Sequence, residues 1–162
     1  TNSSTKIALY NNQHFWSTPI NWNNSTNGII YQLDMTFEYK ESEDTIKLIW
    51  SQPLITSDGN PMSVLLEGSE FFNFLSNNIT KDEVEREFVN LELIMTVGTT
   101  DLKTYIDVNQ PITGIVQERP QFSNINNGIG IFSSRYTYIG SEYIFSANTK
   151  GYITDQFNIS FQ

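Results

Sequence analysis

The sequence predicts a mainly β domain, an antiparallel β-sandwich or open barrel with two short inserted helices. Apolar and polar residues alternate strictly in several extended segments, whereas helical spacing of apolar residues is confined to two short ones. Aromatic residues make up 14% of the 162 residues, so large rings must fill much of the core. A chain of this length accommodates one core, and we expect a single β-rich domain over residues 1–162.

The N-terminal segment, residues 1–27, shows no clear periodicity, and we expect an irregular lead-in there. The chain begins with Thr rather than Met. We therefore expect it to be a fragment of a longer exported protein.

The segment from Gly28 predicts the first long strand. Its residues from 31 to 39 place one set of apolar side chains on the same face, namely Tyr31, Leu33, Met35, Phe37 and Tyr39. The polar run 40–45 predicts a turn, and the alternation over 46–50 predicts the returning strand of an antiparallel hairpin.

A second turn and a helix are expected next. Asp58-Gly59 lies in a cluster of turn-forming residues, and the apolar run 62–66 after it predicts another strand or hairpin connection. Ser69 is a candidate N-cap for a short amphipathic helix. The apolar face of that helix carries Phe71, Phe72, Leu75 and Ile79.

A charged run, residues 81–87, precedes another alternating segment over 88–97. The uniformly apolar face of that segment is predicted to point to the core; it consists of Val89, Leu91, Leu93, Met95 and Val97, with Phe88 on the opposite face. A second short helix over 102–108 is expected to follow Thr99–Asp101 and to end at Pro111.

The region from residue 112 to 128 reads as a long irregular connection, and the chain then returns to strands over 129–140, 143–148 and 157–162. A glycine-rich phosphate-binding loop is one interpretation of the segment that contains Asn127, Gly128 and Gly130. No helix is predicted after them, so we interpret these residues as a tight structural turn that starts a strand.

Composition excludes several functions. Lys and Arg number 9 against 18 Asp and Glu, and the net charge of −9 makes nucleic acid an unfavourable partner. No apolar run is long enough for a membrane span. The absence of cysteine excludes disulfides, thiolate metal sites and cysteine nucleophiles.

The best candidate for ligand binding lies in the N-terminal segment. Trp16 and Trp22 are accompanied by the amides of Asn21 and Asn23. A ring face can stack on the apolar side of a sugar while amides bond its hydroxyls, so these residues could form a glycan platform. Packing of both tryptophans in the core is the alternative.

Catalytic and metal sites receive little support. His14 is the sole histidine, and no nucleophile setting accompanies it. Oxygen ligands for calcium could be sought in residues 58–67, but the turn chemistry there is ordinary. The carboxylates of the charged run are interpreted as a solvated surface; they are Asp82, Glu83, Glu85 and Glu87. We therefore predict no catalytic residues, no metal and no cofactor.

Several spaced segments, "GIIYQLDMTFEYKE", "GSEFFNFLSNNI", "VNLELIMTVGTTDLKTYIDVNQP" and "GIVQERPQFSNINNGIGIFSSR", occur in an order that resembles the C-terminal portion of uncharacterised Bacteroidetes-type cell-envelope lipoproteins. The resemblance covers Gly28 to about Arg135. Its closing motif is matched by Asn124, Ile125, Asn127, Gly128, Gly130 and Phe132.

The resemblance implies a cell-envelope location, periplasmic or at the cell surface, and a lipid anchor in an N-terminal region of the full-length protein. It implies an accessory role, a non-enzymatic binding or assembly module that contacts a glycan or an envelope protein. The long connection is the expected contact region for a protein partner, through Gln117, Glu118, Arg119 and Asn124. A glycan-active hydrolase using acidic residues and a purely structural support domain are the alternatives.

Overall fold

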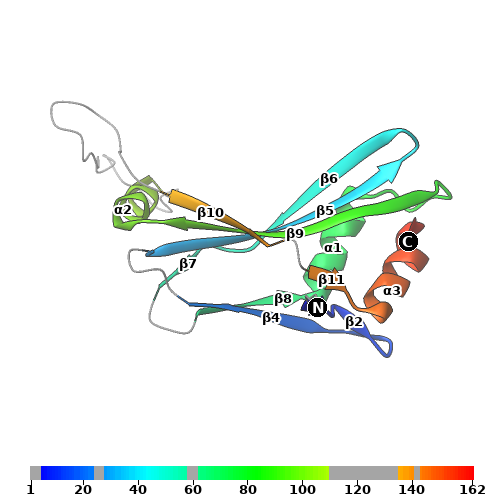
Figure 1. Cartoon of the computed structure of the whole chain (residues 1–162), viewed down its shortest axis with the longest axis horizontal. Helices are drawn as coiled ribbons and strands as arrows, with labels where there is room; N and C mark the ends of the chain where they lie inside the picture. Colours follow the sequence, from blue (N-terminus) through cyan, green and yellow to red (C-terminus); the bar gives the residue numbers. More distant parts are fainter. Residues whose placement is uncertain (1–4, 24–27, 58–61, 110–134, 141–142) are drawn as a thin grey trace, which may run out of the picture.

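The computed structural model describes residues 5–23, 28–57, 62–109, 135–140 and 143–162. These residues form a mainly β fold in which a large antiparallel sheet lies over a smaller two-stranded ribbon (Figure 1). The predicted fold class, an open antiparallel β architecture with short helices, is confirmed. The described residues contain three helices rather than the two that were predicted.

The large sheet consists of four long antiparallel strands in the order β10–β9–β5–β6. Their bounds are Ile30–Glu41 for β5, Asp44–Ser51 for β6, Arg86–Gly98 for β9 and Arg135–Gly140 for β10. Two short strands extend it: β7 (Ile55–Thr56) pairs with β5, and β12 (Ile159–Ser160) runs parallel to β9.

Alternation along β5 sets the inner face of the large sheet. All five apolar side chains predicted to share a face are buried; they are Tyr31, Leu33, Met35, Phe37 and Tyr39. The β5–β6 connection turns at Ser42, whose φ is 58°. The hairpin predicted over this region is therefore confirmed.

The predicted inner face of β9 is wrong at one end. Between Glu38 and Tyr39 the register of β5 against β9 shifts, so that Tyr39 lies opposite Phe88. Phe88 consequently packs against the core, while Val89 is 41% exposed. A β-bulge places one extra residue in a strand and reverses the alternation beyond it.

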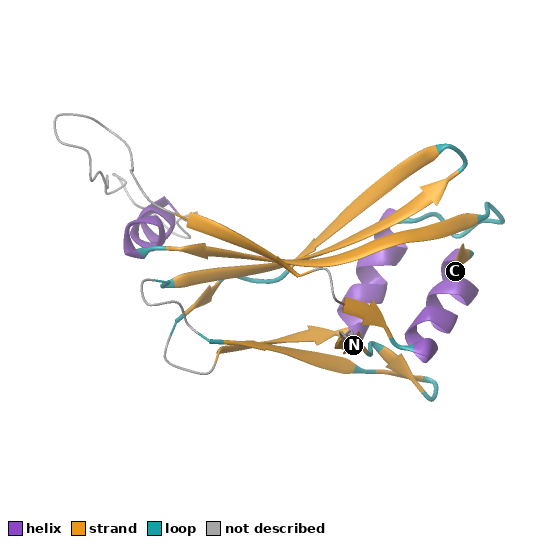
Figure 2. Cartoon of the chain, in the orientation of Figure 1, coloured by secondary structure: helices purple, strands orange, loops and turns teal. Residues whose placement is uncertain are grey.

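The ribbon is formed by β4 (Ser17–Trp22) and β8 (Met62–Glu67), paired antiparallel (Figure 2). The segment predicted to be an irregular lead-in thus contributes strands in its described part. It also supplies β1 (Thr5–Ile7), which runs parallel to β11 (Tyr143–Phe145), and the small hairpin of β2 (Tyr10–Asn11) with β3 (His14–Phe15).

The helix α1 (Gly68–Asn78) starts one residue before the predicted cap. Its N-cap is Glu67, whose side chain makes no capping hydrogen bond. Phe71, Phe72 and Leu75 are buried as the spacing predicts. The second predicted helix is α2 (Thr100–Asn109), at the opposite end of the molecule from α1 (Figure 2), while Asp58, Gly59 and Pro111 lie outside the described residues.

The helix α3 (Ala147–Phe157) replaces part of the strand structure predicted near the C-terminus. Ser146 caps it, and its hydroxyl oxygen accepts a hydrogen bond from the Thr149 N–H at 3.3 Å. The buried Thr149 Oγ1 accepts hydrogen bonds from the backbone N–H of Leu9 and of Tyr10. The N-terminal and C-terminal segments are therefore held together.

The core between the layers is built on aromatic contacts around Phe71 of α1. Its ring centroid lies 5.3 Å from that of Trp50, 5.7 Å from that of Phe145 and 6.2 Å from that of Phe37. Phe37 and Trp50 belong to the large sheet and Phe145 to β11, so α1 connects the large sheet to β11 through a single side chain.

Tyr39, near the end of β5, makes the stability of the fold sensitive to alkaline pH. Burial raises the pKa of the Tyr39 phenol above 10.0, the charge of Glu41 adds to the rise, and Arg86 opposes it. The unfolded state releases this proton at about pH 10, whereas the folded state retains it. The contribution of Tyr39 to stability is therefore fully present below about pH 10 and is lost as the pH rises further.

We expect the Tyr39→Phe variant to lose part of this alkaline decline, because phenylalanine has no proton to release. Urea unfolding followed between pH 8 and pH 11 measures the slope. Burial also raises the pKa of Tyr152, so the double variant with Tyr152→Phe should show a still flatter profile. A Tyr39→Phe slope equal to that of the wild type would contradict the assignment.

Candidate functional site

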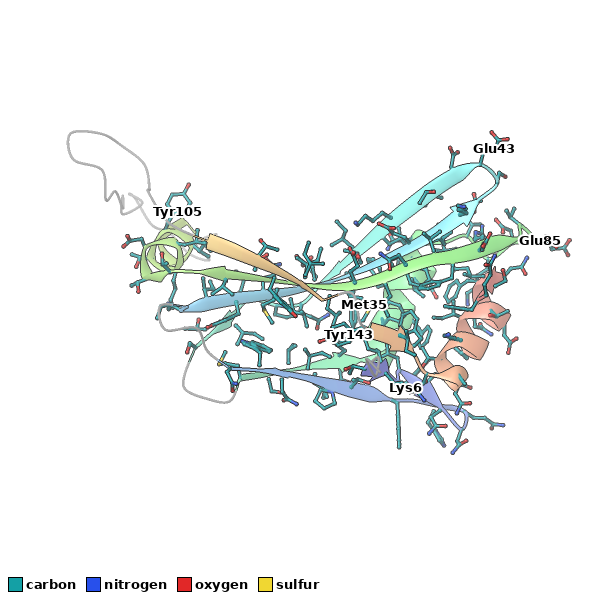
Figure 3. All side chains as sticks on the ribbon, viewed as in Figure 1. Lys6, Met35, Glu43, Glu85, Tyr105 and Tyr143 are labelled. Atoms are coloured by element: carbon teal, nitrogen blue, oxygen red, sulfur yellow. The ribbon has the colours of Figure 1, made fainter. Side chains whose placement is uncertain are left out.

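A cavity of about 200 Å³ lies between the large sheet and the ribbon; we call it the interlayer cavity. Residues of β4, β5, β9, β10 and β11 line it, namely Ile20, Asn21, Trp22, Asn23, Tyr31, Leu33, Leu93, Met95, Val97, Tyr138, Gly140 and Tyr143. Figure 3 shows Tyr143 near the middle of the molecule, below the large sheet. The site depends on both layers being in place.

Cross-strand pairing assembles the sheet side of the cavity. Leu33 of β5 pairs with Met95 of β9, and Met95 pairs in turn with Tyr138 of β10. Side chains directly opposite in neighbouring strands point to the same face, so these three form a continuous row. Tyr31 and Val97 form the adjacent pair.

The ribbon side follows from the alternation of β4. Ile20 is buried and Trp22 is half-buried, whereas Asn21 and Pro19 are exposed. Ile20 and Trp22 therefore lie on the face of the ribbon that points to the sheet. The cavity passes from an apolar floor to a polar rim, because Leu33 is 2% exposed and Tyr138 is 65% exposed.

Gly140 makes room for one of the aromatic side chains. A Cβ atom at this position would lie 2.7 Å from Cε2 of the Tyr143 ring. The glycine therefore allows the Tyr143 ring to approach the end of β10 closely, beside the cavity.

Trp22 has an unusual environment. Its ring centroid lies 5.7 Å from that of Tyr31, and it packs against a small cluster that contains Met62 and Val97. Its indole Nε1 is buried and has no hydrogen-bond partner among the described residues. A buried donor without an acceptor is costly, and such groups often mark a functional position.

None of the described residues that line the cavity is charged. Their side chains are apolar, aromatic or amide. Polar groups in such a site act through hydrogen bonds, because the described lining residues include no cation or carboxylate to pair with a charged ligand.

The structure separates the residues of the predicted glycan platform. Trp22, Asn21 and Asn23 all line the interlayer cavity. Trp16 does not line it; it is 44% exposed, and its backbone bonds to Leu9 and Gly68. The predicted contact residues and turn residues lie outside the described part of the chain; they are Gln117, Glu118, Arg119, Asn124, Asn127, Gly128 and Gly130.

Sequence reasoning missed the sheet half of the site. Tyr138 and Tyr143 lie more than 100 residues after Trp22, and they were assigned only to strands. The spacing of Tyr138 and Gly140 was an available signal that these two residues share one face. The proximity of Tyr138 to Trp22 depends on the pairing of β10 with β9, whereas Tyr143 lies in β11, which pairs with β1.

The charged run is a solvated surface over residues 81–85, whereas Arg86 is buried and Glu87 is half-buried. Asp82, Glu83 and Glu85 are exposed, and Figure 3 shows Glu85 at the tip of the structure, far from Tyr143. Arg86 is buried, which the sequence did not predict. Among the described residues, this arrangement offers no pair of carboxylates facing each other across the cavity.

His14 is exposed at the β2–β3 hairpin, opposite Asn11. The described residues contain no group of three or more His, Cys, Asp or Glu side chains placed to hold a metal ion. In the segment 58–67, where calcium ligands were considered, the candidates Asp58 and Asn60 lie outside the described residues. The third candidate, Glu67, accepts a hydrogen bond from Ser17.

Within the described residues, no helix combines the length and apolar character that crossing a bilayer requires. Comparisons with protein-family models, with curated protein sequences and with solved structures found no match for this chain. The resemblance to envelope lipoproteins therefore stays a prediction.

Proposed function

We propose that this chain is a non-enzymatic binding module and that the interlayer cavity is its ligand site. The observation that carries the proposal is the convergence of three predicted platform residues, Asn21, Trp22 and Asn23, on one cavity. Aromatic rings from the opposite layer complete the lining. A concave site with apolar walls and a few polar groups is the usual form of a small-ligand site.

A glycan is the ligand class that this lining suits best. The C–H face of a pyranose packs on aromatic rings, and its hydroxyls bond to amides. Trp22 and Tyr31 supply rings, Asn21 and Asn23 line the cavity beside them, and the exposed Tyr138 supplies a hydroxyl at the rim. The cavity size admits one sugar ring, so the module would hold a single unit or the end of a chain.

The proposal extends to location and partners. We place the module in the cell envelope, periplasmic or at the cell surface, with a lipid anchor in the full-length protein. The support for this is the resemblance over Gly28 to Arg135. A contact between the 117–124 region and another envelope protein stays a prediction, because those residues lie outside the described part of the chain.

Glycan binding by two tryptophan variants tests the ligand site. We expect the wild-type chain to bind members of a glycan array, and the Trp22→Ala variant to bind at least ten-fold more weakly, about 1.4 kcal/mol. The loss arises because a ring of the cavity wall is removed. Isothermal titration on the selected glycans measures the ratio.

Trp16→Ala is the matched control, since it removes an indole outside the cavity. It should keep wild-type affinity. Circular dichroism checks that both variants remain folded. Equal weakening by the two substitutions, or full binding by a folded Trp22→Ala chain, would contradict the assignment of the cavity.

A further inference from the structure

The interior of the interlayer cavity narrows its ligand further, on the basis of the function proposed above. We infer that the group that fills this cavity is uncharged and apolar, about the size of one six-membered hydrocarbon ring. A glycan bound by this module would therefore carry an aryl or branched alkyl substituent, and it would keep its hydroxyls at the rim. The floor, the surface that Trp22 presents and the size of the cavity support this inference.

The sheet side of the floor is hydrocarbon. Leu93, Met95 and Val97 alternate along β9 and share one face, and Leu33 of β5 pairs with Met95. The leucines and the valine carry no polar side-chain atom, and the thioether of Met95 is only a weak acceptor. A ligand hydroxyl placed against these side chains would lose its hydrogen bonds to water without gaining a partner.

The strand β4 adds no polar side-chain group to the floor. Ile20 and Trp22 face the large sheet, whereas Asn21 alternates to the opposite face of β4. Trp22 is half-buried and its Nε1 is fully buried, so its indole offers only ring carbons to a ligand. Ring carbons and aliphatic side chains attract apolar groups through the hydrophobic effect and dispersion.

Charge and exposure set the orientation of the ligand. None of the described lining residues is charged, so a charged group inside the cavity would lose its hydration without gaining an opposite charge. Tyr138, by contrast, is 65% exposed and lies at the rim. The polar part of a ligand therefore remains beside Tyr138, in contact with water.

The cavity has the size of one ring. Its volume is about 200 Å³. An apolar protein cavity of roughly 150 Å³ binds benzene, so one hydrocarbon ring with a single small substituent fits. Met95 is unbranched and flexible, and it can adjust to the outline of the bound group.

Matched glucosides test the inference on the full chain. The 4-methylphenyl and 4-hydroxyphenyl β-D-glucopyranosides have nearly the same size and differ only at the ring position farthest from the sugar. That position lies against the floor when the ring enters the cavity. Methyl β-D-glucopyranoside lacks the ring. Isothermal titration measures each affinity, and toluene added as a competitor shows whether the hydrocarbon ring alone occupies the cavity.

We expect the 4-methylphenyl glucoside to bind at least about ten-fold more tightly than either of the other glucosides, because its deep end leaves no hydroxyl unpaired. Toluene should compete with it. The chain contains three methionines, whose methyl signals ¹³C labelling resolves. At saturation the Met95 signal should move in the ring current of the bound aryl group, while Met35, which does not line the cavity, keeps its position.

A cavity-filling variant provides a second test. Met95→Trp places an indole inside the cavity and should weaken binding of the 4-methylphenyl glucoside at least about ten-fold. Val89→Trp is the matched control, because Val89 lies on the same strand, is 41% exposed and does not line the cavity. It should bind like the wild type. Circular dichroism checks that both variants are folded.

The outcomes separate this inference from the proposed function. Equal affinity for the 4-methylphenyl and 4-hydroxyphenyl glucosides, an unshifted Met95 signal at saturation, or full binding by a folded Met95→Trp chain would overturn the inference and leave glycan binding standing. Binding of toluene without binding of any glucoside or array glycan would support the apolar cavity and contradict the glycan proposal. If none of these molecules binds, both fail.

Discussion

The Gly68→Ala variant is expected to be destabilised by about 3 kcal/mol or more. Gly68 is the first residue of α1. A Cβ atom there would lie 2.5 Å from the carbonyl oxygen of Trp16 and still closer to that of Leu9. Both neighbours are backbone atoms, so neither can move aside by a rotamer change.

The clash also breaks an interlocking set of backbone hydrogen bonds. Gly68 N–H donates to the Trp16 carbonyl at 2.8 Å, and Trp16 N–H donates to the Leu9 carbonyl at 2.9 Å. Displacing α1 to accommodate the methyl group would stretch the first of these bonds. Urea unfolding monitored by circular dichroism measures the loss.

Gly151→Ala provides the matched control, because it makes the same chemical change in another helix. Gly151 lies within α3, and a Cβ atom there would meet nothing within 4 Å. Alanine favours the helix over glycine by about 1 kcal/mol, so this variant should be more stable than the wild type. Similar unfolding midpoints for the two variants would refute the packing at Gly68.

The Arg86→Met variant is expected to lose about 3 kcal/mol of stability, a typical loss when one partner of a buried ion pair is removed. The Arg86 side chain is 2% exposed. Its Nε lies 2.5 Å from a Glu41 oxygen, and its NH2 nitrogen lies 3.0 Å from an Asp82 oxygen. Methionine preserves much of the aliphatic volume and removes every donor.

Arg86 also satisfies backbone acceptors at the end of α3. Its NH1 nitrogen donates to the carbonyl of Phe157 at 3.1 Å and to that of Val84 at 3.3 Å. Burial lowers the pKa of the guanidinium, but the hydrogen bonds to Glu41 and Asp82 outweigh it and the pKa is raised. The group therefore stays charged at every pH at which the protein is folded.

Lys47→Met is the control for Arg86→Met. Lys47 pairs with Glu38 at 2.9 Å, but its side chain is 44% exposed and the pair is solvated. Exposed ion pairs contribute little to stability. Its unfolding midpoint in urea should lie much closer to the wild type than that of Arg86→Met. Equal losses would mean that Arg86 contributes no more than a surface pair.

Three of the twelve described residues that line the candidate site were predicted from local sequence as ligand-binding residues. The tryptophan and amides at residues 21–23 form a recognisable ligand-binding pattern over three adjacent positions. The pattern could not distinguish Trp16 from Trp22. Only Trp22 lies opposite the large sheet and lines the cavity, and that depends on the tertiary structure. Placing Tyr138 required the pairing of β10 with β9, and placing Tyr143 required the pairing of β11 with β1.

The sequence by itself determined the elements whose burial follows a local period. The five inner side chains of β5 and the phenylalanine face of α1 needed only their own spacing. In a half-buried strand or helix, buried and exposed side chains recur at the period of the backbone, about 2 residues in a strand and about 3.6 in a helix. That repetition is visible in any single sequence.

Only the tertiary structure decided the features that depend on residues far apart in the chain. The bulge at Val89 arises from register against β5, and α3 has a weak apolar period and is tied to Leu9 and Tyr10 through Thr149. The interlayer cavity and the environment of Arg86 likewise require several elements to meet. Contacts between residues far apart in the chain produce no regular spacing of apolar residues in the sequence, because each element contributes only one or two of the residues involved.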